Sequence, residues 1–403
     1  MTPYVITFIV MVGVFMIGCF AFKLPVGVSM LIAALCGETI RMMVEGEFGY
    51  VDTILTIGCA MIFMKVIEGS GALDALSSLI IEKFHRFPAV LLVLIMLIIM
   101  FPGMITGSST AAVLSAGSIM APVLALMGID AVTSGSIIAM GALLGMIAPP
   151  VNTAALIICA GIDVPYVGFE GPLALITFPL AILFVLLLGY KQARHMDYEK
   201  LKPALEKQDA IRKQYGVRIY IPLLVLVALM VIFKVLKLGE DIGMPLMFLI
   251  SAAVGLFTGK KINVLTAVPE AIRTAAPVMG ILMGVGMFIE VMTATGVRGL
   301  VVISCLRLPS TLWLLACAIS IPLFGAVSSY GASSVLGVPF AYIYASLLGG
   351  NSVVVLAAIS LIAAVGDMMP PTALAGLFAA QVTGVEKYTK ILKRCIVPII
   401  ILL

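Results

Sequence analysis

The sequence predicts an all-α integral membrane protein made of two related halves, and three observations lead to this fold class. Of the 403 residues, 62% are hydrophobic and only 11% are charged, whereas a soluble domain has about 25% charged residues. The hydrophobic runs are continuous for about 20 residues, as in membrane-spanning helices, and do not alternate as in an outer-membrane barrel. Residues 101–153 and 324–372 repeat one pattern of glycine, serine and paired prolines.

The first half begins with apolar runs. Three membrane spans are expected there, at residues 4–22, 25–40 and 51–67. Residues 69–86 differ, because Leu73 and Leu76 recur at helical spacing opposite Asp74 and Glu82. An amphipathic helix of this kind lies along the membrane interface, so we expect a linking helix here.

The next apolar region is interrupted by the segment GMITGSS, whose glycines and serines favour a turn. On either side, residues 88–100 and 106–127 predict the two short arms of a re-entrant hairpin. The first arm is expected to end at Pro102 and Gly103, since proline interrupts a helix.

Paired prolines interrupt one later span in each half. The span predicted at residues 132–161 contains APP at 148–150, and the span predicted at residues 353–382 contains Pro370 and Pro371. A proline in a helix interior removes a hydrogen bond and clashes with the preceding turn. Each of these spans is therefore expected as two half-helices.

The polar linker at residues 191–218 separates the halves, and the pattern then repeats. The other expected elements are spans at 172–190, 219–235, 244–257, 276–292 and 388–403, an interfacial piece at 260–273, a linking segment at 296–308, and hairpin arms at 309–323 and 333–348. The predicted organisation is a first repeat over 1–190, a cytoplasmic linker over 191–218 and a second repeat over 219–403. It has about ten transmembrane helices and two re-entrant hairpins.

The distribution of charge predicts the topology. If the 191–218 linker is cytoplasmic, most Lys and Arg residues fall in inside loops, which is the bias of membrane proteins. The N-terminus is then outside. Five crossings in each half make the two copies face opposite ways, so the hairpins open from opposite sides of the membrane as an inverted repeat.

Broken helices predict the function class. In a bilayer, backbone groups freed by a break are tolerated only where they are buried in protein or line a cavity. Interruptions at matching places in two halves are typical of the binding site of a secondary transporter. An ion channel is the less favoured alternative, and an enzyme is not expected, because the chain lacks a zinc-protease, GxSxG or Walker motif.

These motifs resemble the large membrane subunit (DctM-like) of tripartite ATP-independent periplasmic (TRAP) transporters, within the ion-transporter superfamily. The resemblance covers most of the chain, including KLPVGVSMLIAAL, FPGMITGSSTAA, GMIAPPVNTAA and PPTALAGLFAAQVTGV. It implies an elevator-type, Na+-coupled importer of a small organic anion, of the dicarboxylate or sugar-acid type. In that family the hairpins and broken helices form a mobile transport domain, carried by a scaffold of the remaining helices.

The resemblance also implies partners and a location. A four-helix small membrane subunit and a periplasmic substrate-binding protein accompany this family, in the bacterial or archaeal inner (cytoplasmic) membrane. Besides Na+ as the coupling ion, no cofactor is expected, and neither is a nucleic-acid partner. The chain departs from the family pattern at Asp367, which follows Gly366 where a neutral residue is expected.

Each hairpin tip that faces a Pro-Pro break is a candidate Na+ site, because freed carbonyls and hydroxyls bind Na+ without adding a formal charge. The first site is expected to contain Thr106, Ser108, Ser109, Gly145, Ala148 and Asn152. The second site is expected to contain Ser328, Ser329, Gly331, Ser333, Gly366, Met369 and Thr372.

An anionic substrate is expected between the two tips, where the N-termini of half-helices favour negative charge. The expected substrate-binding residues are Ser108, Thr110, Asn152, Thr153, Ser334 and Thr372. Asp367 is a candidate for cation or proton coupling, since an ionisable residue inside the membrane usually has a function. Coupling to protons through Asp367 in a stand-alone permease of the same superfamily is the main alternative.

Overall fold

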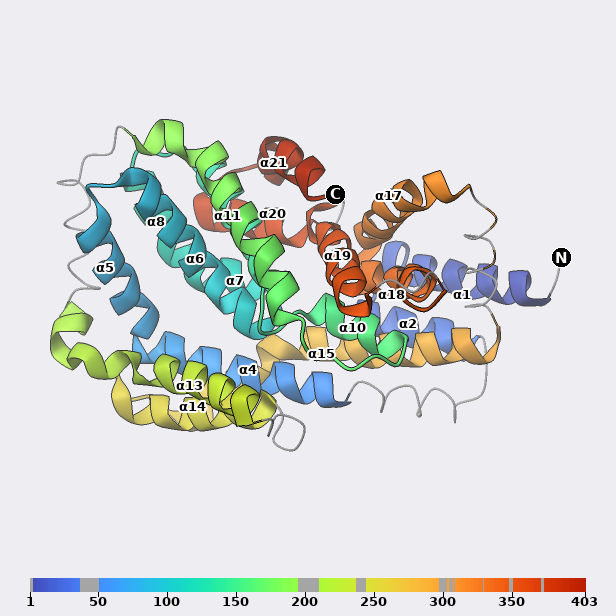
Figure 1. Cartoon of the computed structure of the whole chain (residues 1–403), viewed down its shortest axis with the longest axis horizontal. Helices are drawn as coiled ribbons and strands as arrows, with labels where there is room; N and C mark the ends of the chain where they lie inside the picture. Colours follow the sequence, from blue (N-terminus) through green and yellow to red (C-terminus); the bar gives the residue numbers. More distant parts are fainter. Residues whose placement is uncertain are drawn as a thin grey trace.

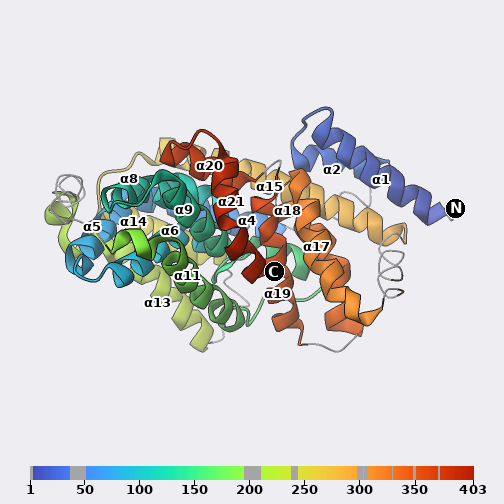
Figure 2. The same ribbon diagram turned by 90° about the horizontal axis from the view of Figure 1, so that it is seen from above.

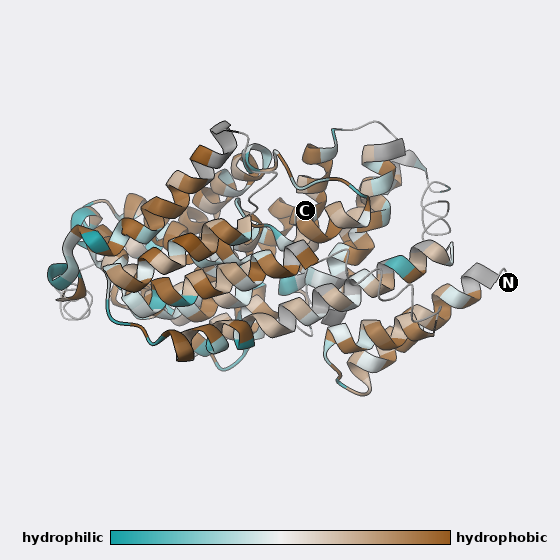
Figure 3. Cartoon of the chain, turned by 90° about the horizontal axis from the view of Figure 1, so that it is seen from below, coloured by the Kyte–Doolittle hydropathy of each residue, from teal (hydrophilic) through white to brown (hydrophobic). Residues whose placement is uncertain are grey.

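The computed structural model describes residues 3–36, 51–194, 210–236, 244–296, 303, 307, 309–328, 330–347, 351–370 and 373–403. Every regular element within these ranges is a helix, and much of the helical ribbon has the brown colour of hydrophobic residues (Figure 3). This part of the prediction, an all-α fold of apolar helices, is confirmed.

The first part of the chain forms the helices that end at the polar linker. They are α1 (Pro3–Phe20), α2 (Val26–Leu35), α4 (Val51–Ser70), α5 (Ala72–Phe84), α6 (Pro88–Thr106), α7 (Ser109–Ala112), the π-helix η1 (Val113–Gly117), α8 (Ser118–Leu126), α9 (Ala131–Ile147), α10 (Thr153–Gly161) and α11 (Glu170–Ala193).

The second part repeats the sequence of long helix, hairpin and broken helix. Its elements are η3 (Gly216–Tyr220), α13 (Ile221–Leu236), α14 (Met244–Thr258), α15 (Val264–Ala294), α17 (Ser310–Ser328), α18 (Tyr330–Ala341), the π-helix η5 (Tyr342–Leu347), α19 (Ser352–Ala364), η6 (Val365–Met368), α20 (Leu374–Thr383) and α21 (Tyr388–Leu402).

One layer contains helices that precede the hairpin in each of the two parts. In it α15 packs on α2 and α4, α4 packs on α14, and α14 packs on α13. These helices lie along the lower edge of Figure 1, and α1 and α2 form one end of the molecule in Figure 2. Small residues allow close packing, since a Cβ at Gly284 would lie 2.8 Å from Gly27 Cα.

The hairpins and broken helices form the rest of the molecule, above this layer in Figure 1. The first hairpin, α6 to α8, packs on α9, and α11 packs on both α6 and α9. The two half-helices that follow the breaks exchange partners. After the first break α10 packs on α18 and α19, whereas after the second break α20 packs on α9 and η1. The two breaks therefore lie where the two parts of the chain meet.

The linking helix predicted at residues 69–86 is present as α5. It turns from α4 by 61° at Gly71, whose φ of 80° favours glycine. One face buries Leu73 and Ile81, and the segment before α13 holds the helix from outside. Arg212 pairs with Glu82, and the Tyr220 hydroxyl donates to the carbonyl of Ala75 at 3.1 Å.

Two helices, α6 of the first hairpin and α15 of the lower layer, have limits that differ from the prediction. Helix α6 continues through Pro102 to Thr106 and does not stop at Pro102–Gly103. Helix α15 is one helix, where an interfacial piece and a separate span were expected at 260–273 and 276–292. Asn263, directly before the helix, accepts from Leu265 N at 3.0 Å, and Glu270, within the polar stretch, pairs with Lys65 at 2.9 Å. The polar stretch is therefore accommodated within one helix.

The second hairpin also differs, because its arms reach closer to the tip than the expected limits of 323 and 333. Helix α17 runs to Ser328 and α18 begins at Tyr330, so Gly331 and Ser333 lie inside a helix. The Tyr330 N–H, one of the amides left free at a helix N-terminus, donates to Asp367 Oδ1 at 3.0 Å. This bond allows the helix to start before the predicted residue.

Three helices in the described ranges are long and apolar enough to cross a membrane alone: Pro88–Thr106, Ser109–Leu126 and Glu170–Ala193. The bent pair α4–α5 would add a fourth. The first two are the arms of the first hairpin. The first arm extends beyond the expected 88–100, whereas the second lies within the expected 106–127. The other apolar helices are shorter, so the count of ten crossings stays a prediction. Most of the expected linking segment at 296–308 lies outside the described residues.

Candidate functional site

A pair of glycines joins each hairpin to the broken helix that follows it. A Cβ added to Gly103 would lie 2.9 Å from the carbonyl carbon of Gly145, and a Cβ added to Gly325 would lie 2.5 Å from Gly366 Cα. Backbone meets backbone at both places. Each hairpin tip is therefore held directly against the helix that ends at the break.

The hydroxyls of the first tip end one helix and begin the next. Thr106 Oγ1 donates to the carbonyl of Pro102 at 2.7 Å and accepts from Ser108 N at 3.3 Å. Ser108 caps α7 by accepting from Ala111 N at 3.3 Å. Between them, Gly107 has φ 60° and is the C-cap of α6. All three polar side chains of the tip, Thr106, Ser108 and Ser109, are buried.

Backbone hydrogen bonds connect this tip to the first break. Val151 N donates to the carbonyl of Met104 at 3.1 Å, and Thr153 Oγ1 donates to the carbonyl of Gly107 at 2.7 Å. Ala148 N bonds to the last turn of α9, to the carbonyls of Leu144 and Gly145. The predicted first-site residues are thus brought together, and several of their polar atoms already bond to protein.

Asn152 spans the first break and reaches the second half of the chain. Its Oδ1 caps α10 by accepting from Ala155 N at 2.9 Å. Its Nδ2 donates to the carbonyl of Ile147 at 3.1 Å and to Ser360 Oγ at 2.8 Å. The side chain is fully buried. These bonds fix the two half-helices α9 and α10 relative to α19.

Asp367 is the point at which the two hairpin tips meet. It lies in η6, directly before the second break, and is 1% exposed. Ser109 Oγ of the first tip donates to Oδ2, and Tyr330 N of the second tip donates to Oδ1 at 3.0 Å. The Tyr330 side chain lies beside Thr153. The two sites that the sequence treats as separate are therefore connected through one carboxylate.

The second tip contains a hydroxyl with no hydrogen-bond partner in the described structure. Ser333 is fully buried, and its Oγ makes no hydrogen bond there. A Cβ at Gly325 would overlap this oxygen. Ser334, in contrast, donates to the carbonyl of Tyr330 at 2.7 Å. Met369 N donates to the carbonyl of Gly366 at 3.2 Å, at the last turn before the break.

Some predicted residues are not placed by these contacts. Ser329, Thr372 and the side chain of Ser328 lie outside the described residues. Thr110 is half-buried in α7. Gly331, Ser333 and Ser334 lie in the first turns of α18, where a non-helical tip was expected. The other candidates lie at the first tip and at the two breaks.

Two residues that take part in hydrogen bonds of this site were not identified from the sequence. The sequence did contain a signal for Ser360, because it is a serine within the apolar run SVVVLAAISLIAA. Tyr330 contributes its backbone N–H, for which the residue type gives no signal.

The oxygen atoms gathered here suit a hard monovalent cation. Carbonyls, hydroxyls and one carboxylate are the ligands that such ions prefer, and Ser333 Oγ has no hydrogen-bond partner among the described residues. No group of three or more His, Cys, Asp and Glu side chains that could hold a metal ion occurs in the described ranges. Transition metals favour nitrogen and sulfur ligands, whereas the groups placed here by the described residues are oxygen atoms.

One comparison with known proteins finds a family for this chain. A family model described as "Tripartite ATP-independent periplasmic transporter, DctM component" matches residues 5–403. No curated protein matches the chain.

Proposed function

We propose, from the premise that this chain belongs to the DctM component family of tripartite ATP-independent periplasmic transporters, that it imports a small organic anion coupled to Na+. The family consists of multi-pass components of the bacterial inner membrane that transport and are not enzymes. Its members work with a small subunit and a periplasmic binding protein. For this chain, a four-helix small subunit and a binding protein are the proposed partners.

The observation that carries this proposal is the paired contact between hairpin tip and helix break. Gly103 on Gly145 and Gly325 on Gly366 give the same arrangement twice. In a secondary transporter, breaks of this kind line the central site, where carbonyls bind the coupling ion and helix N-termini face the anion. The substrate would lie between the tips, near Ser108 and Thr153, and would be a dicarboxylate or a sugar acid.

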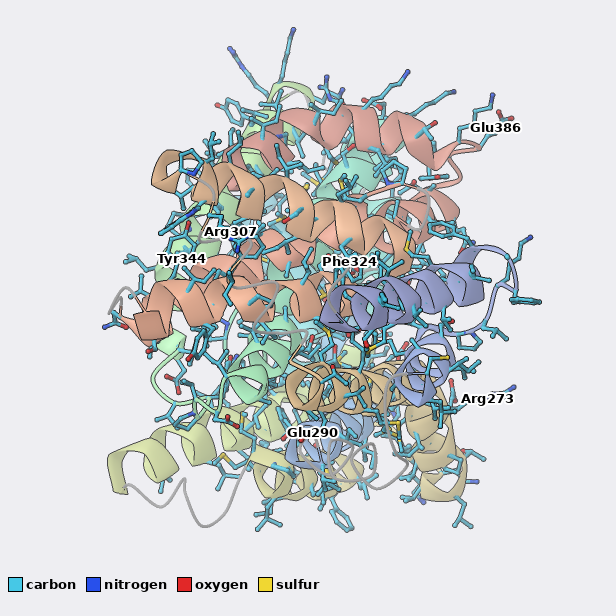
Figure 4. All side chains as sticks on the ribbon, turned by 90° about the vertical axis from the view of Figure 1, so that its right-hand side faces the viewer. Arg273, Glu290, Arg307, Phe324, Tyr344 and Glu386 are labelled. Carbon is cyan, nitrogen blue, oxygen red and sulfur yellow. The ribbon has the colours of Figure 1, made fainter. Side chains whose placement is uncertain are left out.

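The separation into two groups of helices supports an elevator mechanism. The proposed scaffold is α1, α2, α4, α13, α14 and α15, and the proposed mobile domain is the hairpins and the broken helices. Part of the boundary between them is aromatic: the Phe15 ring of α1, which also packs on Phe288 of α15, lies 5.8 Å from Phe324 of α17. Phe324 is labelled in Figure 4. An apolar boundary has few hydrogen bonds to break when one group moves along the other.

The positions of charged residues support an inverted repeat with a cytoplasmic linker. Arg273 and Glu386, both in predicted inside segments, lie toward the right-hand edge of Figure 4, and Arg307, in a predicted outside segment, lies in the left half. Loops rich in Lys and Arg face the cytoplasm. The N-terminus of the chain is accordingly proposed to be outside.

One observation favours a second candidate, which is proton coupling in a stand-alone permease. Asp367 is a buried carboxylate at the meeting point of the tips, and an acid in this position can carry a proton as well as ligate a cation.

The experiment that decides between them is uptake into proteoliposomes under separate gradients. The chain would be reconstituted with and without a small subunit and a binding protein of the same family, and supplied with a panel of dicarboxylates and sugar acids. The proposal requires uptake driven by an inward Na+ gradient at equal pH on both sides. Uptake driven only by a pH gradient would establish the alternative, and currents of channel size without any gradient coupling would contradict both.

A further inference from the structure

We propose that the phenol of Tyr330 binds a hydroxyl group of the transported anion, so that this chain selects hydroxylated acids over unsubstituted dicarboxylates. This inference rests on the proposed transport of a small organic anion between the two hairpin tips, and it narrows the substrate class of that same site. It assigns a role to the side chain of Tyr330, in addition to the backbone N–H that bonds to Asp367.

The Tyr330 phenol is a buried hydrogen-bonding group without a partner in the described ranges. The residue is 5% exposed, and its hydroxyl oxygen makes no hydrogen bond with any described residue. Buried tyrosine hydroxyls ordinarily have a partner, because bulk water no longer supplies one. A few polar groups of this kind, set among apolar residues, are what orients a small molecule in its binding site.

Both halves of the chain fix the position of this phenol. Tyr330 begins α18 at the second hairpin tip, where its N–H is held by Asp367 Oδ1 at 3.0 Å. Its side chain lies beside Thr153, the first residue of α10 after the first break, and α10 packs on α18. The phenol therefore lies between the two tips, where the anion is proposed to bind.

The hydroxyl of Thr153 determines which ligand group fits beside the phenol. Thr153 Oγ1 donates its one proton to the carbonyl of Gly107 at 2.7 Å, so toward any other group it can only accept. The phenol and this hydroxyl do not form a hydrogen bond with each other. A ligand oxygen that satisfies both must accept from Tyr330 and donate to Thr153. An alcohol hydroxyl does both, whereas a carboxylate oxygen only accepts.

The other unpartnered hydroxyl of the second tip has a different setting. Ser333 Oγ also makes no hydrogen bond among the described residues, but it adjoins Gly325 within the same half of the chain. Tyr330 faces a residue of the other half. A group bonded by Tyr330 and Thr153 would bridge the two halves, as a substrate held between the two tips must.

Selectivity follows from the fate of water at this point. While the site is open, water can bond to the phenol, and an acid without the hydroxyl would displace this water without replacing its hydrogen bond. A site built to hydrogen-bond a substrate hydroxyl discriminates strongly against the analogue that lacks it.

Binding of matched acids to the purified full chain tests this assignment. Succinate, malate and tartrate carry the same two carboxylates with increasing numbers of hydroxyls, and gluconate is compared with its deoxy analogue. Affinities are obtained from thermal stabilisation in Na+ buffer, since a ligand that binds only the folded state raises its stability. In the wild-type chain, the hydroxylated member of at least one pair should bind about tenfold tighter or more.

Tyr330→Phe removes the phenol oxygen and keeps the ring. The preference for the hydroxylated acid should fall about tenfold. The affinity for succinate and the stability of the ligand-free chain should stay as in wild type, because the oxygen bonds to no described residue. A purely structural role would change that stability or weaken the binding of all acids alike. Thr153→Val should reduce the same preference.

The matched control is Tyr220→Phe. It removes a phenol oxygen that donates to the carbonyl of Ala75 in the linking helix at 3.1 Å, and it should leave the affinity for every acid unchanged. If Tyr330→Phe does not fold, the wild-type comparison and Thr153→Val carry the test.

The outcomes separate this inference from the proposed function. Equal wild-type affinities within every pair, or an undiminished preference in Tyr330→Phe (in Thr153→Val where Tyr330→Phe does not fold), would overturn the assignment while anion transport stands. Uniformly weaker binding of all acids in Tyr330→Phe would also overturn it. A wild-type chain that binds none of these acids would overturn this inference, and the proposed function would fall with it only if Na+-driven uptake were absent as well.

Discussion

Asn152 Nδ2 donates to Ser360 Oγ at 2.8 Å and so joins the first helix break to the second half of the chain. The same amide caps α10 through Ala155 N and bonds to the carbonyl of Ile147 at the end of α9. One side chain thereby fixes three helix segments around the proposed binding site. Its contribution to stability and its contribution to transport should be separable by mutation.

Asn152→Ala removes a helix cap and two buried hydrogen bonds, and should lower the free energy of unfolding by about 1–3 kcal/mol. Ser360→Ala removes only one of these bonds, so its cost should be about 1 kcal/mol. The double variant should cost less than the sum of the two single variants, because the residues are in contact. Thermal unfolding in detergent measures all three, and strictly additive costs would show that the bond does not contribute.

Gly145→Ala should separate the first hairpin from the broken helix. The added Cβ would lie 2.7 Å from Met100 Cα, a backbone atom that cannot move independently of its helix. Overpacking of this kind costs about 1–3 kcal/mol, and uptake should fall strongly because the tip is displaced. The control is Gly13→Ala in α1, where a Cβ meets nothing within 4 Å. Wild-type uptake in Gly145→Ala would refute the close contact.

A cross-link across the proposed sliding boundary should stop transport. In a chain whose seven cysteines have been replaced, Phe15→Cys with Phe324→Cys places thiols on α1 and α17, whose rings lie 5.8 Å apart. A short thiol cross-linker should abolish uptake, and reduction should restore it.

The matched control for that cross-link lies within the proposed scaffold. Phe63→Cys with Phe248→Cys joins α4 to α14, whose rings lie 6.0 Å apart. Each pair loses two packed aromatic rings, so the general loss of stability is similar. Full uptake after cross-linking of the first pair, or equal inhibition by both pairs, would argue against an elevator.

Gly71→Ala tests the bend between α4 and the linking helix α5. An alanine at φ 80° is strained, and its Cβ would lie 3.0 Å from Ile211 Cγ2. Gly216→Ala has a similar positive φ of 58° but meets nothing within 4 Å. Thermal unfolding should show about 1 kcal/mol of backbone strain in both variants. Gly71→Ala should cost more, and equal costs would mean that Ile211 gives way freely.

Local sequence signals predicted much of the architecture. The amphipathic pattern around Asp74 and Glu82 predicted α5, and the paired prolines at 149–150 predicted the break between α9 and α10. These features depend on neighbouring residues, and local sequence is enough to find them.

The features that were missed depend on contacts across the fold. Helix α18 begins at Tyr330 because a carboxylate from η6 accepts its N–H. Helix α15 continues past residue 273, and the acid within its polar stretch, Glu270, has its partner Lys65 on another helix. The exchange of α10 and α20 between the two parts of the chain brings Asp367 to Ser109. No spacing within a single segment encodes these partners.

The most direct test of the account is the side from which each hairpin opens. Phe87, before the first hairpin, is 62% exposed, and Arg307, before the second, is also exposed. In a cysteine-free chain, Phe87→Cys and Arg307→Cys would each be labelled in intact cells and in inverted vesicles with a thiol reagent that does not cross membranes. The account predicts that Cys at position 87 reacts only from the cytoplasm and Cys at position 307 only from outside. Labelling of both positions from the same side would contradict the inverted arrangement on which the transport proposal depends.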